Sequence, residues 1–358
     1  MRDLNSLSWT RLMAESVTTE RGLPPEMQSD IDDMEAVRRV YPVRINPYYL
    51  ALIQKGGDPL RRQVVPDRCE LTDGMAMDDP LSEAEQSPVT GLIHRYPDRV
   101  VLLVSGMCPV LCRFCMRKRL AGRALSLSDD QIMDAVAYIQ SEPAIREVIL
   151  SGGDPLMLSD DALAAILARI GRINHVETVR VHTRTPAALP QRITPALAAL
   201  LKRYHPLYLN IHMNHPDEVT AEFAAACAML ADAGIPLGSQ TVLLKGVNDS
   251  ADVMKRLMRQ LLRNRVRPYY LHHPDLVRGT GHFRVPIERG LAIMRSLSGN
   301  ISGMAMPRYM IDLPGGGGKV SLLPDDVQAV DGGYLAVRNH RGEVYYYPAG
   351  DTVTGACG

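Results

Sequence analysis

The sequence has no excess of charge, no long apolar run and no tract of biased composition apart from four consecutive glycines. Its 40 Lys and Arg residues balance 40 Asp and Glu residues, so the net charge is zero and provides no basic field for nucleic acid. No stretch approaches the roughly 18 apolar residues of a membrane span. The start, Met1-Arg-Asp-Leu-Asn5, lacks the basic and then apolar pattern of a signal peptide. We therefore expect a cytoplasmic protein that binds neither nucleic acid nor membrane.

The remaining composition is that of an ordinary globular protein. Hydrophobic residues make up 46% and charged residues 22% of 358 residues, enough for one large α/β domain with appended pieces or for two small domains. Cysteine is scarce and uneven. Cys108, Cys112 and Cys115 lie close together, whereas Cys69, Cys227 and Cys357 are scattered. A disulfide framework belongs mainly to small secreted chains, so the clustered thiols indicate a metal site.

The chain divides into three predicted parts. Residues 1–90 form a helical N-terminal region, with helical patterning at 8–15 and 25–39. Residues 91–310 alternate short apolar runs with longer amphipathic stretches, which is typical of parallel βαβ units. The six predicted strands are 100–104, 147–150, 178–182, 207–212, 237–244 and 266–271, and the helices between them lie near 129–141, 160–172, 193–203, 217–233 and 250–264.

Six such units predict an α/β fold with a partial (βα)6 barrel, in which chemistry occurs at the C-terminal ends of the strands. Residues 311–358 contain the glycine run and a predicted β-hairpin formed by 334–339 and 343–347. We expect this segment to form a small C-terminal β extension.

The three clustered cysteines follow the first predicted strand, with the spacing Cys-x3-Cys-x2-Cys. Thiolates suit iron–sulfur clusters or zinc. Structural zinc usually takes four ligands supplied as two pairs, and the sequence has no second pair. Three cysteines on a four-iron cluster leave one iron open for a small molecule. The alternatives are a zinc knob or a chance clustering.

Two other glycine-containing segments are candidates for ligand binding. Ser151-Gly152-Gly153-Asp154-Pro155 follows the second strand, where glycines permit close backbone approach and Asp154 can accept from an ammonium group. A plain strand-to-helix turn is the alternative. The run Gly315–Gly318 before Lys319 is not a phosphate-binding loop, because Leu313 and Val320 do not fit that pattern. Lys319 next to apolar residues suits a Schiff-base lysine, and a flexible linker is the alternative that the residues alone leave open.

The cysteine loop after the first strand resembles that of the radical S-adenosylmethionine (SAM) superfamily, and Gly-Gly-Asp-Pro resembles its contact to the methionine amino group. Together with His94-Arg95-Tyr96-Pro97-Asp98-Arg99 and Pro-Gly-Gly-Gly-Gly-Lys319, the loop is similar to the lysine 2,3-aminomutase family. The likeness runs from about residue 46 to residue 347. It also includes Arg184-Thr-Pro, Asn214-His-Pro, the segment 239–249 and Gly281-His-Phe-Arg284.

This resemblance implies three cofactors and their ligands: a [4Fe-4S] cluster on the three cysteines, SAM, and pyridoxal phosphate on Lys319. By matching positions, SAM is bound by Ser151, Gly152, Gly153, Asp154, His212 and Gln240, and the phosphate of pyridoxal phosphate by Arg95, Tyr96 and Arg99. Arg117 is expected to hold the substrate carboxylate, and Asp275 and Asp312 the far ammonium group. A core histidine, a surface arginine pair and solvated acids are the structural alternatives at these positions.

The resemblance implies an isomerase that interconverts L-lysine and β-lysine by 5′-deoxyadenosyl radical chemistry on a pyridoxal phosphate aldimine. Two acids at the end of the pocket suit a basic amino acid and would repel a second carboxylate. The alternatives are an aminomutase that supplies β-lysine for elongation factor P modification, or one for arginine, ornithine or glutamate. A reductant such as flavodoxin or ferredoxin and a homo-oligomer are expected.

The sequence departs from the family pattern at several positions. Ser250 replaces a cysteine of the family's zinc site and the tail offers only Cys357, so no zinc is predicted. Phe114 replaces a common histidine and Met116 a polar residue. The hairpin favours the longer, metabolic branch of the family over a shorter branch, whereas His272-His273-Pro274 is not typical of it. A catalytically idle metal protein that binds a partner is the alternative from another class.

Overall fold

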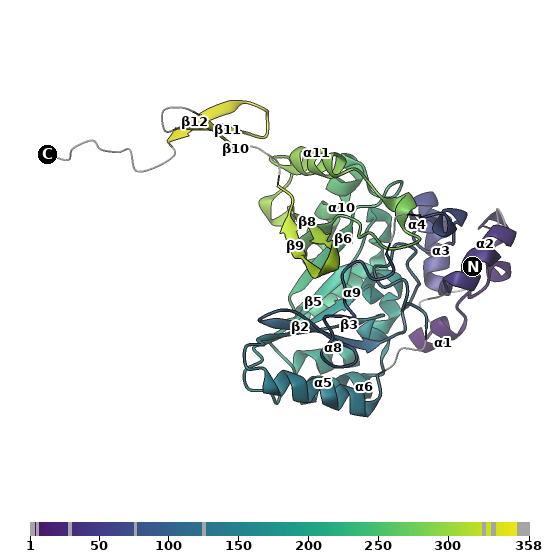
Figure 1. Cartoon of the computed structure of the whole chain (residues 1–358). Helices are drawn as coiled ribbons and strands as arrows, with labels where there is room; N and C mark the ends of the chain where they lie inside the picture. The colour runs from purple at the N-terminus through teal and green to yellow at the C-terminus, as the bar shows by residue number, and fades with distance from the viewer. Residues whose placement is uncertain are drawn as a thin grey trace.

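The computed structural model describes residues 4, 7–27, 31–74, 77–123, 127–323, 327–330 and 334–348. Its centre is a barrel-like sheet with helices on the outside (Figure 1). Helices of the N-terminal region gather at one side of the barrel, and a small separate sheet near the C-terminus lies outside it (Figure 1). The α/β class, the helical N-terminal region and the C-terminal β extension are thereby confirmed.

A nine-stranded sheet forms the wall of the barrel, and its strands follow one another in sequence order. Seven strands pair in parallel, and one antiparallel strand lies at each edge. The strands are β1 (Leu92–Tyr96), β2 (Arg99–Ser105), β3 (Glu147–Gly152), β4 (Thr178–Thr183), β5 (Leu207–His212), β6 (Leu237–Val242), β7 (Val266–His272), β8 (Arg308–Leu313) and β9 (Gly318–Ser321). The six predicted strands correspond to β2–β7, and β8 extends the parallel sheet by one strand.

Helices on the outside connect the parallel strands. They are α5 (Asp129–Ser141), α6 (Asp160–Ile170), the short α7 (Thr185–Ala188), α8 (Pro195–Lys202), α9 (Ala221–Asp232), α10 (Ala251–Arg263) and α11 (Ile287–Leu297). With α7 set aside, they give six βα units, from β2–α5 to β7–α11. The sequence predicted α5, α6, α8, α9 and α10, and it missed α7 and α11. The partial (βα)6 barrel is therefore confirmed.

Side-chain caps fix where several of these helices begin. Ser128 accepts a hydrogen bond from Gln131 N, and the Gln131 side chain accepts one from Ser128 N. Thr194 and Thr220 cap α8 and α9 in the simpler one-bond form. Ser250 caps α10 by accepting from the backbone N–H of Val253 at 3.3 Å. Such a cap contributes about 1 kcal/mol, so Ser250 has a structural task of its own.

Alternate residues of the parallel strands face opposite sides of the barrel wall, as the two-residue period of a strand requires. On β5, Leu209 and Ile211 pack beneath the helices in the main hydrophobic core, whereas Asn210 and His212 line the interior. Complete burial of one such aliphatic side chain contributes roughly 1.5–3 kcal/mol. The wall is thus stabilised from outside, which leaves the interior available for polar groups.

The N-terminal helices pack against the loop that carries the three cysteines. Asn46 caps α3 by accepting from Tyr49 N, and its amide donates to the carbonyls of Pro109 and Ala188 at 3.0 and 2.9 Å. Val110 of the cysteine loop belongs to the same hydrophobic cluster as α3. The helices are α1 (Trp9–Ala14), α2 (Ile31–Val40), α3 (Pro47–Gly56) and α4 (Asp58–Arg61). Short 3-10 helices occur at Glu20–Gly22, Pro25–Met27, Arg68–Leu71, Pro155–Met157, Pro190–Arg192, Pro216–Glu218, Gly281–Phe283, Gly303–Ala305 and Pro314–Gly316.

The C-terminal sheet has three antiparallel strands, β10 (Val327–Val330), β11 (Tyr334–Arg338) and β12 (Val344–Pro348). The predicted hairpin is formed by β11 and β12. The expected boundary at residue 310 falls within β8, which pairs with both β7 and β9, and the division into domains stays a prediction. Among the described helices, none is both long and apolar enough to cross a bilayer.

The two edge strands, β1 and β9, meet through side chains. Tyr96 Oη accepts a hydrogen bond from the backbone N–H of Lys319 at 2.8 Å. Arg95 Nη1 lies 3.7 Å from Asp312 Oδ1 on the neighbouring β8. Within the described part of the chain, β1 pairs only with β2 and β9 only with β8, so the two edge strands share no backbone ladder. We call this place, defined by Arg95, Tyr96, Asp312 and Lys319, the seam of the barrel.

Candidate active site

The interior of the barrel holds a cavity of about 990 Å³. This volume is at the upper end of the range for ligand pockets. The cavity extends from the cysteine loop at the C-terminal ends of the strands down to Glu147 and Arg267 near their N-terminal ends. Every residue that the sequence analysis assigned to a site lines it: Arg95, Tyr96, Arg99, Cys108, Cys112, Cys115, Arg117, Ser151, Gly152, Gly153, Asp154, His212, Gln240, Asp275, Asp312 and Lys319.

The thiols of the cysteine loop are enclosed by protein. Burial raises the pKa of all three, that of Cys108 well above its ordinary value and that of Cys115 to about 11. Thiols of this kind lose their protons when a metal binds. No group of three or more His, Cys, Asp or Glu side chains in the described residues converges on a single ion. All three cysteines line the same cavity, and their role as cluster ligands stays a prediction.

A buried ion network holds the loop in place, and the sequence analysis did not identify it. Arg113, between Cys112 and Phe114, donates to Glu70 at 2.6 Å, and Lys118 Nζ lies 2.7 Å from the same carboxylate. Lys118 also donates to the carbonyls of Arg113 and Gly279. Burial lowers the pKa of Lys118 to about 8, although Glu70 opposes the shift. The loop is thus anchored on its outer side by opposite charges.

The glycines after β3 allow two loops to approach each other. A Cβ at Gly153 would lie 2.5 Å from the carbonyl oxygen of Met107, and Gly152 has a φ of 122°. Gly153 N and Asp154 N donate to carbonyls of the cysteine loop. Close backbone approach was predicted here toward a ligand, whereas the structure shows it toward the cysteine loop.

The carboxylate of Asp154 is already saturated. It accepts from Thr183 Oγ1 and Arg184 N, both at 2.7 Å, and from the backbone N–H groups of Leu156 and Thr185. Burial nevertheless raises its pKa. In this structure Asp154 connects the end of β3 to the end of β4. Its expected contact to an ammonium group stays a prediction.

Lys319 lies at the seam, directly opposite Asp312. The two residues are partners across the antiparallel β8–β9 pair, and Lys319 Nζ donates a hydrogen bond to Asp312 Oδ2. The glycine run forms the turn between these strands, with positive φ at Gly315, Gly316 and Gly318, where other residues are strained. The run is therefore a tight turn that aims a lysine into the cavity.

The three residues expected to bind phosphate lie beside Lys319. Arg95 Nε donates to Gln86 Oε1 at 2.6 Å, and Arg95 Nη2 donates to the carbonyl of Leu81. The guanidinium of Arg99 stacks over the Tyr96 ring at 4.0 Å. The sequence analysis missed Arg180, which also lines this end of the cavity, pairs with Glu147 at 2.7 Å and has a buried Nε without a hydrogen-bond partner.

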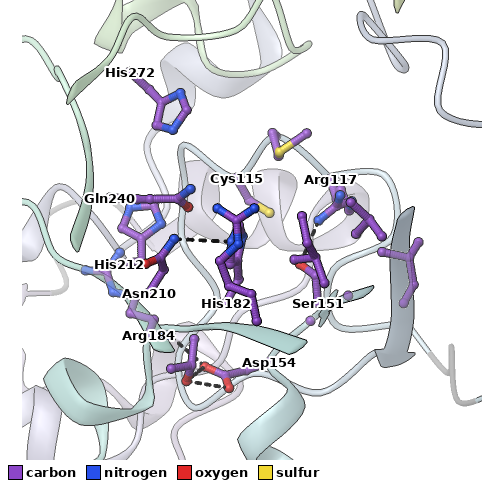
Figure 2. Close-up of a pocket in the computed structure, with 18 of the residues that line it drawn as sticks. Cys115, Arg117, Ser151, Asp154, His182, Arg184, Asn210, His212, Gln240 and His272 are labelled. Carbon is purple, nitrogen blue, oxygen red and sulfur yellow. Dashed lines mark hydrogen bonds between the residues drawn. The ribbon is translucent and has the colours of Figure 1, made fainter. Parts of the chain in front are cut away.

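The expected substrate residues line the same cavity, and Arg117 is close enough to Asp275 for each charge to affect the pKa of the other. Arg117 forms a two-pronged ion pair with Glu83 at 2.7–3.1 Å and donates to Ser151 Oγ at 3.3 Å (Figure 2). Asp275 lies near Asp312, and burial together with that carboxylate raises the pKa of Asp275 to about 7. Glu83 was not identified from the sequence, because nothing in its local pattern distinguishes it from a surface acid.

Neutral histidines occupy the middle of the cavity. Figure 2 shows His182, His212 and His272 around one space with Gln240 and Cys115. Burial and Arg184 lower the pKa of His212 to about 3, and its Nε2 has no hydrogen-bond partner. Burial likewise lowers the pKa of His272 to about 3 and that of His182 well below its ordinary value. His182 and Asn210 were missed, although polar residues at alternate positions of apolar strands are the signal that identifies them.

Comparisons with known proteins agree with this arrangement. The radical SAM superfamily matches residues 102–257, and the family described as Lysine-2,3-aminomutase matches residues 294–357. The L-lysine 2,3-aminomutase of Clostridium subterminale is 44% identical, over 99% of this chain and 86% of that protein. That of Fusobacterium nucleatum subsp. nucleatum is 46% identical, over 92% of this chain and 77% of that protein. The glutamate 2,3-aminomutase of Clostridioides difficile is 42% identical, over 84% and 72%.

These similarities extend over nearly the whole chain and join the cysteine loop to the segment that carries Lys319. The relatives are aminomutases named for two different amino acids. The cavity collects the cysteines, the lysine and charges of both signs in one enclosed space. This chain belongs to the lysine 2,3-aminomutase family of radical SAM enzymes.

Proposed function

We propose that this chain is an L-lysine 2,3-aminomutase that carries pyridoxal phosphate on Lys319. The observation that carries the proposal is the charge pattern around Lys319 within one cavity. Asp312 contacts Lys319, Asp275 lies beside it, and Arg117, which follows the cysteine loop in sequence, lines the same cavity. L-Lysine has a carboxylate at one end and an ammonium group at the other, and it matches this pattern.

The residues present fit an iron–sulfur cluster and SAM. Cys108, Cys112 and Cys115 would hold the cluster, and two buried nitrogens without partners, Arg184 Nε and His212 Nε2, are available to polar groups of a ligand. When bound, this pair supplies an organic radical that removes hydrogen from an unactivated carbon. The chain orients the reactants and encloses them, because buried apolar side chains such as Leu103 and Phe114 also line the cavity and exclude water.

The residues at the seam fit pyridoxal phosphate. Lys319 provides the amine, and Arg95, Tyr96 and Arg99 are proposed for the phosphate; Arg180 adds a further cation with a free Nε. When bound, pyridoxal phosphate supplies a conjugated ring that stabilises an adjacent radical while the amino group moves. Planar guanidinium groups suit phosphate oxygens, and the Arg99 side chain is held in position by its stacking on Tyr96.

Asp312 is placed to receive the far ammonium group of the substrate. In the structure its carboxylate binds Lys319 Nζ. A bound substrate would place its far ammonium group against Asp312, and Asp275 would provide a second carboxylate beside it. A buried carboxylate is costly without a cation, so a substrate with a far ammonium group would suit this part of the cavity. Arg117, held by Glu83 and Ser151, then orients the substrate carboxylate.

The same charges argue against glutamate as the substrate. Its second carboxylate would lie against Asp275 and Asp312, where repulsion and burial both raise the free energy of binding. Several relatives of high identity are named L-lysine 2,3-aminomutase, and this name supports the choice of lysine. The radical step needs one electron, which we propose comes from a flavodoxin or ferredoxin, and we propose a homo-oligomer.

The decisive experiment is an anaerobic assay of the reconstituted protein. Iron, sulfide and pyridoxal phosphate are loaded, SAM and dithionite are added, and L-lysine, L-arginine, L-ornithine and L-glutamate are supplied in separate reactions. We expect β-lysine from L-lysine without net loss of SAM. Conversion of another amino acid in place of lysine overturns the substrate. Absence of SAM cleavage by a protein with an intact cluster overturns the radical function.

A further inference from the structure

Arg184 connects the cysteine loop to a buried carboxylate on the far side of the cavity wall. It lies directly after β4 and its side chain is almost fully buried, at 7% exposure. Its Nη1 donates to Cys112 Sγ at 3.0 Å, and its Nη2 donates to Glu218 Oε1 at 2.7 Å. The guanidinium therefore lies between a cluster cysteine and an acid. Figure 2 shows Arg184 near His212 and Asp154.

The carboxylate of Glu218 is fixed independently of Arg184. Its Oε2 accepts from the backbone N–H groups of Asn214 and His215 at 2.9 and 2.8 Å, and Tyr49 Oη donates to Oε1 at 2.9 Å. Gln63 Oε1 gives Arg184 Nη2 another acceptor, at 2.8 Å. These contacts hold Nη2 of Arg184, so that Nη1 of the same guanidinium points to Cys112 Sγ.

The contact to Cys112 distinguishes this cysteine from the other two. Among the described residues, Cys112 is the cysteine of the loop whose Sγ accepts a side-chain hydrogen bond. Arg184 also lies over the face of Phe114, with 5.3 Å between its Cζ and the ring centroid. Its Nε is buried and has no partner in the structure. Arg184 thus brings a positive charge to Cys112 Sγ and lines the same cavity as the three cysteines.

We propose that Arg184 is a positioning residue that raises the reduction potential of the cluster through its hydrogen bond to Cys112 Sγ. The inference rests on the proposed function only in requiring the cluster. Reduction adds a negative charge to the cluster, and a buried cation next to a ligand sulfur stabilises the reduced form. Glu218 binds Nη2, whereas Cys112 Sγ accepts from Nη1. Within the Arg184–Glu218 ion pair, the arginine is therefore nearer the sulfur than the carboxylate is. Such outer partners commonly tune metal sites.

The test compares the cluster potential of three proteins reconstituted alike, without amino acid substrate. We expect Arg184→Gln to make reduction at least tenfold less favourable, which is about 59 mV for a one-electron couple. Arg192→Gln is the matched control. Arg192 is also a buried arginine, bonded to the carbonyls of Leu156 and Leu158 and paired with Asp160, and it does not line the cavity. Equal potentials in Arg184→Gln and the unaltered protein overturn the proposal.

A second measurement needs no variant and applies even where Arg184→Gln fails to fold. The unaltered protein is labelled with 15N in its arginine side chains, and pulsed electron paramagnetic resonance is recorded on the reduced cluster. We expect a 15N coupling, because a hydrogen-bonded guanidinium nitrogen lies close to the ligand sulfur. Its absence overturns the proposal. Iron and sulfide content is measured on the same samples, so loss of the cluster, which concerns the proposed function, is recognised separately.

Discussion

Lys319 and Asp312 face each other across the β8–β9 turn, where the lysine Nζ donates a hydrogen bond to the carboxylate. The acid is buried at 5% exposure, whereas the lysine keeps 30% exposure toward the cavity. A lysine held in this way is fixed in direction and remains accessible to a carbonyl compound. The position of both residues follows from the glycine turn between their strands.

Replacing this lysine tests its role directly. We expect Lys319→Ala to lose the visible absorbance of a pyridoxal phosphate Schiff base and to reduce aminomutase activity to background, because no amine remains at the seam. Lys245→Ala is the control, since Lys245 is exposed and lies outside the cavity. The measurement is the absorbance spectrum with a turnover assay. A Schiff base retained in Lys319→Ala would place the cofactor on another lysine.

The second acid of the pocket is expected to determine affinity for lysine. Asp275→Asn removes one of the two carboxylates that are proposed to receive the ammonium group, so KM for L-lysine should rise roughly tenfold to hundredfold. Asp249→Asn is a suitable control, because Asp249 accepts from Gly246 N in an exposed loop outside the cavity. The measurement is KM for L-lysine from steady-state kinetics of both variants and the unaltered protein. An unchanged KM in Asp275→Asn would remove Asp275 from the binding site.

The raised pKa of Asp275 predicts a dependence of lysine binding on pH. Burial and Asp312 raise this pKa to about 7, and only the ionised carboxylate attracts an ammonium group. We expect kcat/KM for L-lysine to fall as the pH decreases below about 7, by up to about tenfold per pH unit. The Asp275→Asn variant should lack this limb of the profile.

The same shift predicts a dependence of stability on pH. The folded protein binds the proton of Asp275 more tightly than the unfolded chain does. This group therefore favours folding at low pH, and its contribution is lost as the pH rises through about 7. Asp275→Asn should thus raise Tm more at pH 8 than at pH 5, as measured by thermal unfolding. An equal change in Tm at both pH values would contradict this assignment.

The anchor of the cysteine loop should be important for stability. Glu70→Gln leaves Arg113 and Lys118 as buried cations without a counter-charge, and breaking such a pair costs about 3–5 kcal/mol. Urea unfolding should show this loss together with reduced iron content. Glu35→Gln, which breaks an exposed helical pair with Arg39, should change the free energy of unfolding by no more than about 1 kcal/mol. Equal effects of the two substitutions would contradict the anchoring role.

Close packing between the two loops at the cluster predicts sensitivity to a single methyl group. In Gly153→Ala the new Cβ would meet the carbonyl of Met107 at 2.5 Å, and relief requires movement of the backbone, at a cost of about 1–3 kcal/mol. Gly303→Ala is the control, because a Cβ there meets nothing within 4 Å. Iron per chain after reconstitution is the measurement. Normal iron content in Gly153→Ala would show that the cysteine loop adapts to the methyl group.

The sequence predicted the parts of the fold that depend on local patterns. Strands β2–β7 are short apolar runs, and the hairpin β11–β12 flanks a turn at 340–342. β8 was missed because the run Arg308–Leu313 begins with a charge, contains Asp312 and is followed by glycines. Helix α11 was missed although its amphipathic pattern is clear in the structure, with Ile293 and Leu297 buried.

The site was predicted where residues match a family motif, and missed where distant segments meet. The cysteines, Lys319 and the acids were named from such motifs, and the structure brings them into one cavity, although their roles stay predictions. Glu83, Arg184 and Glu218 lie in different segments, and their contacts to Arg117 and Cys112 depend on the tertiary fold. Cys357 lies outside the described residues.

The seam has a further consequence for how molecules reach the interior of the barrel. Elsewhere the wall is a continuous ladder of backbone hydrogen bonds, and opening it would break several of them at once. Between β1 and β9 the join includes the bond from Lys319 N to Tyr96 Oη and the contact between Arg95 and Asp312. Opening the wall at the seam would therefore break fewer backbone hydrogen bonds than opening it elsewhere, and it would move the strand that carries Lys319.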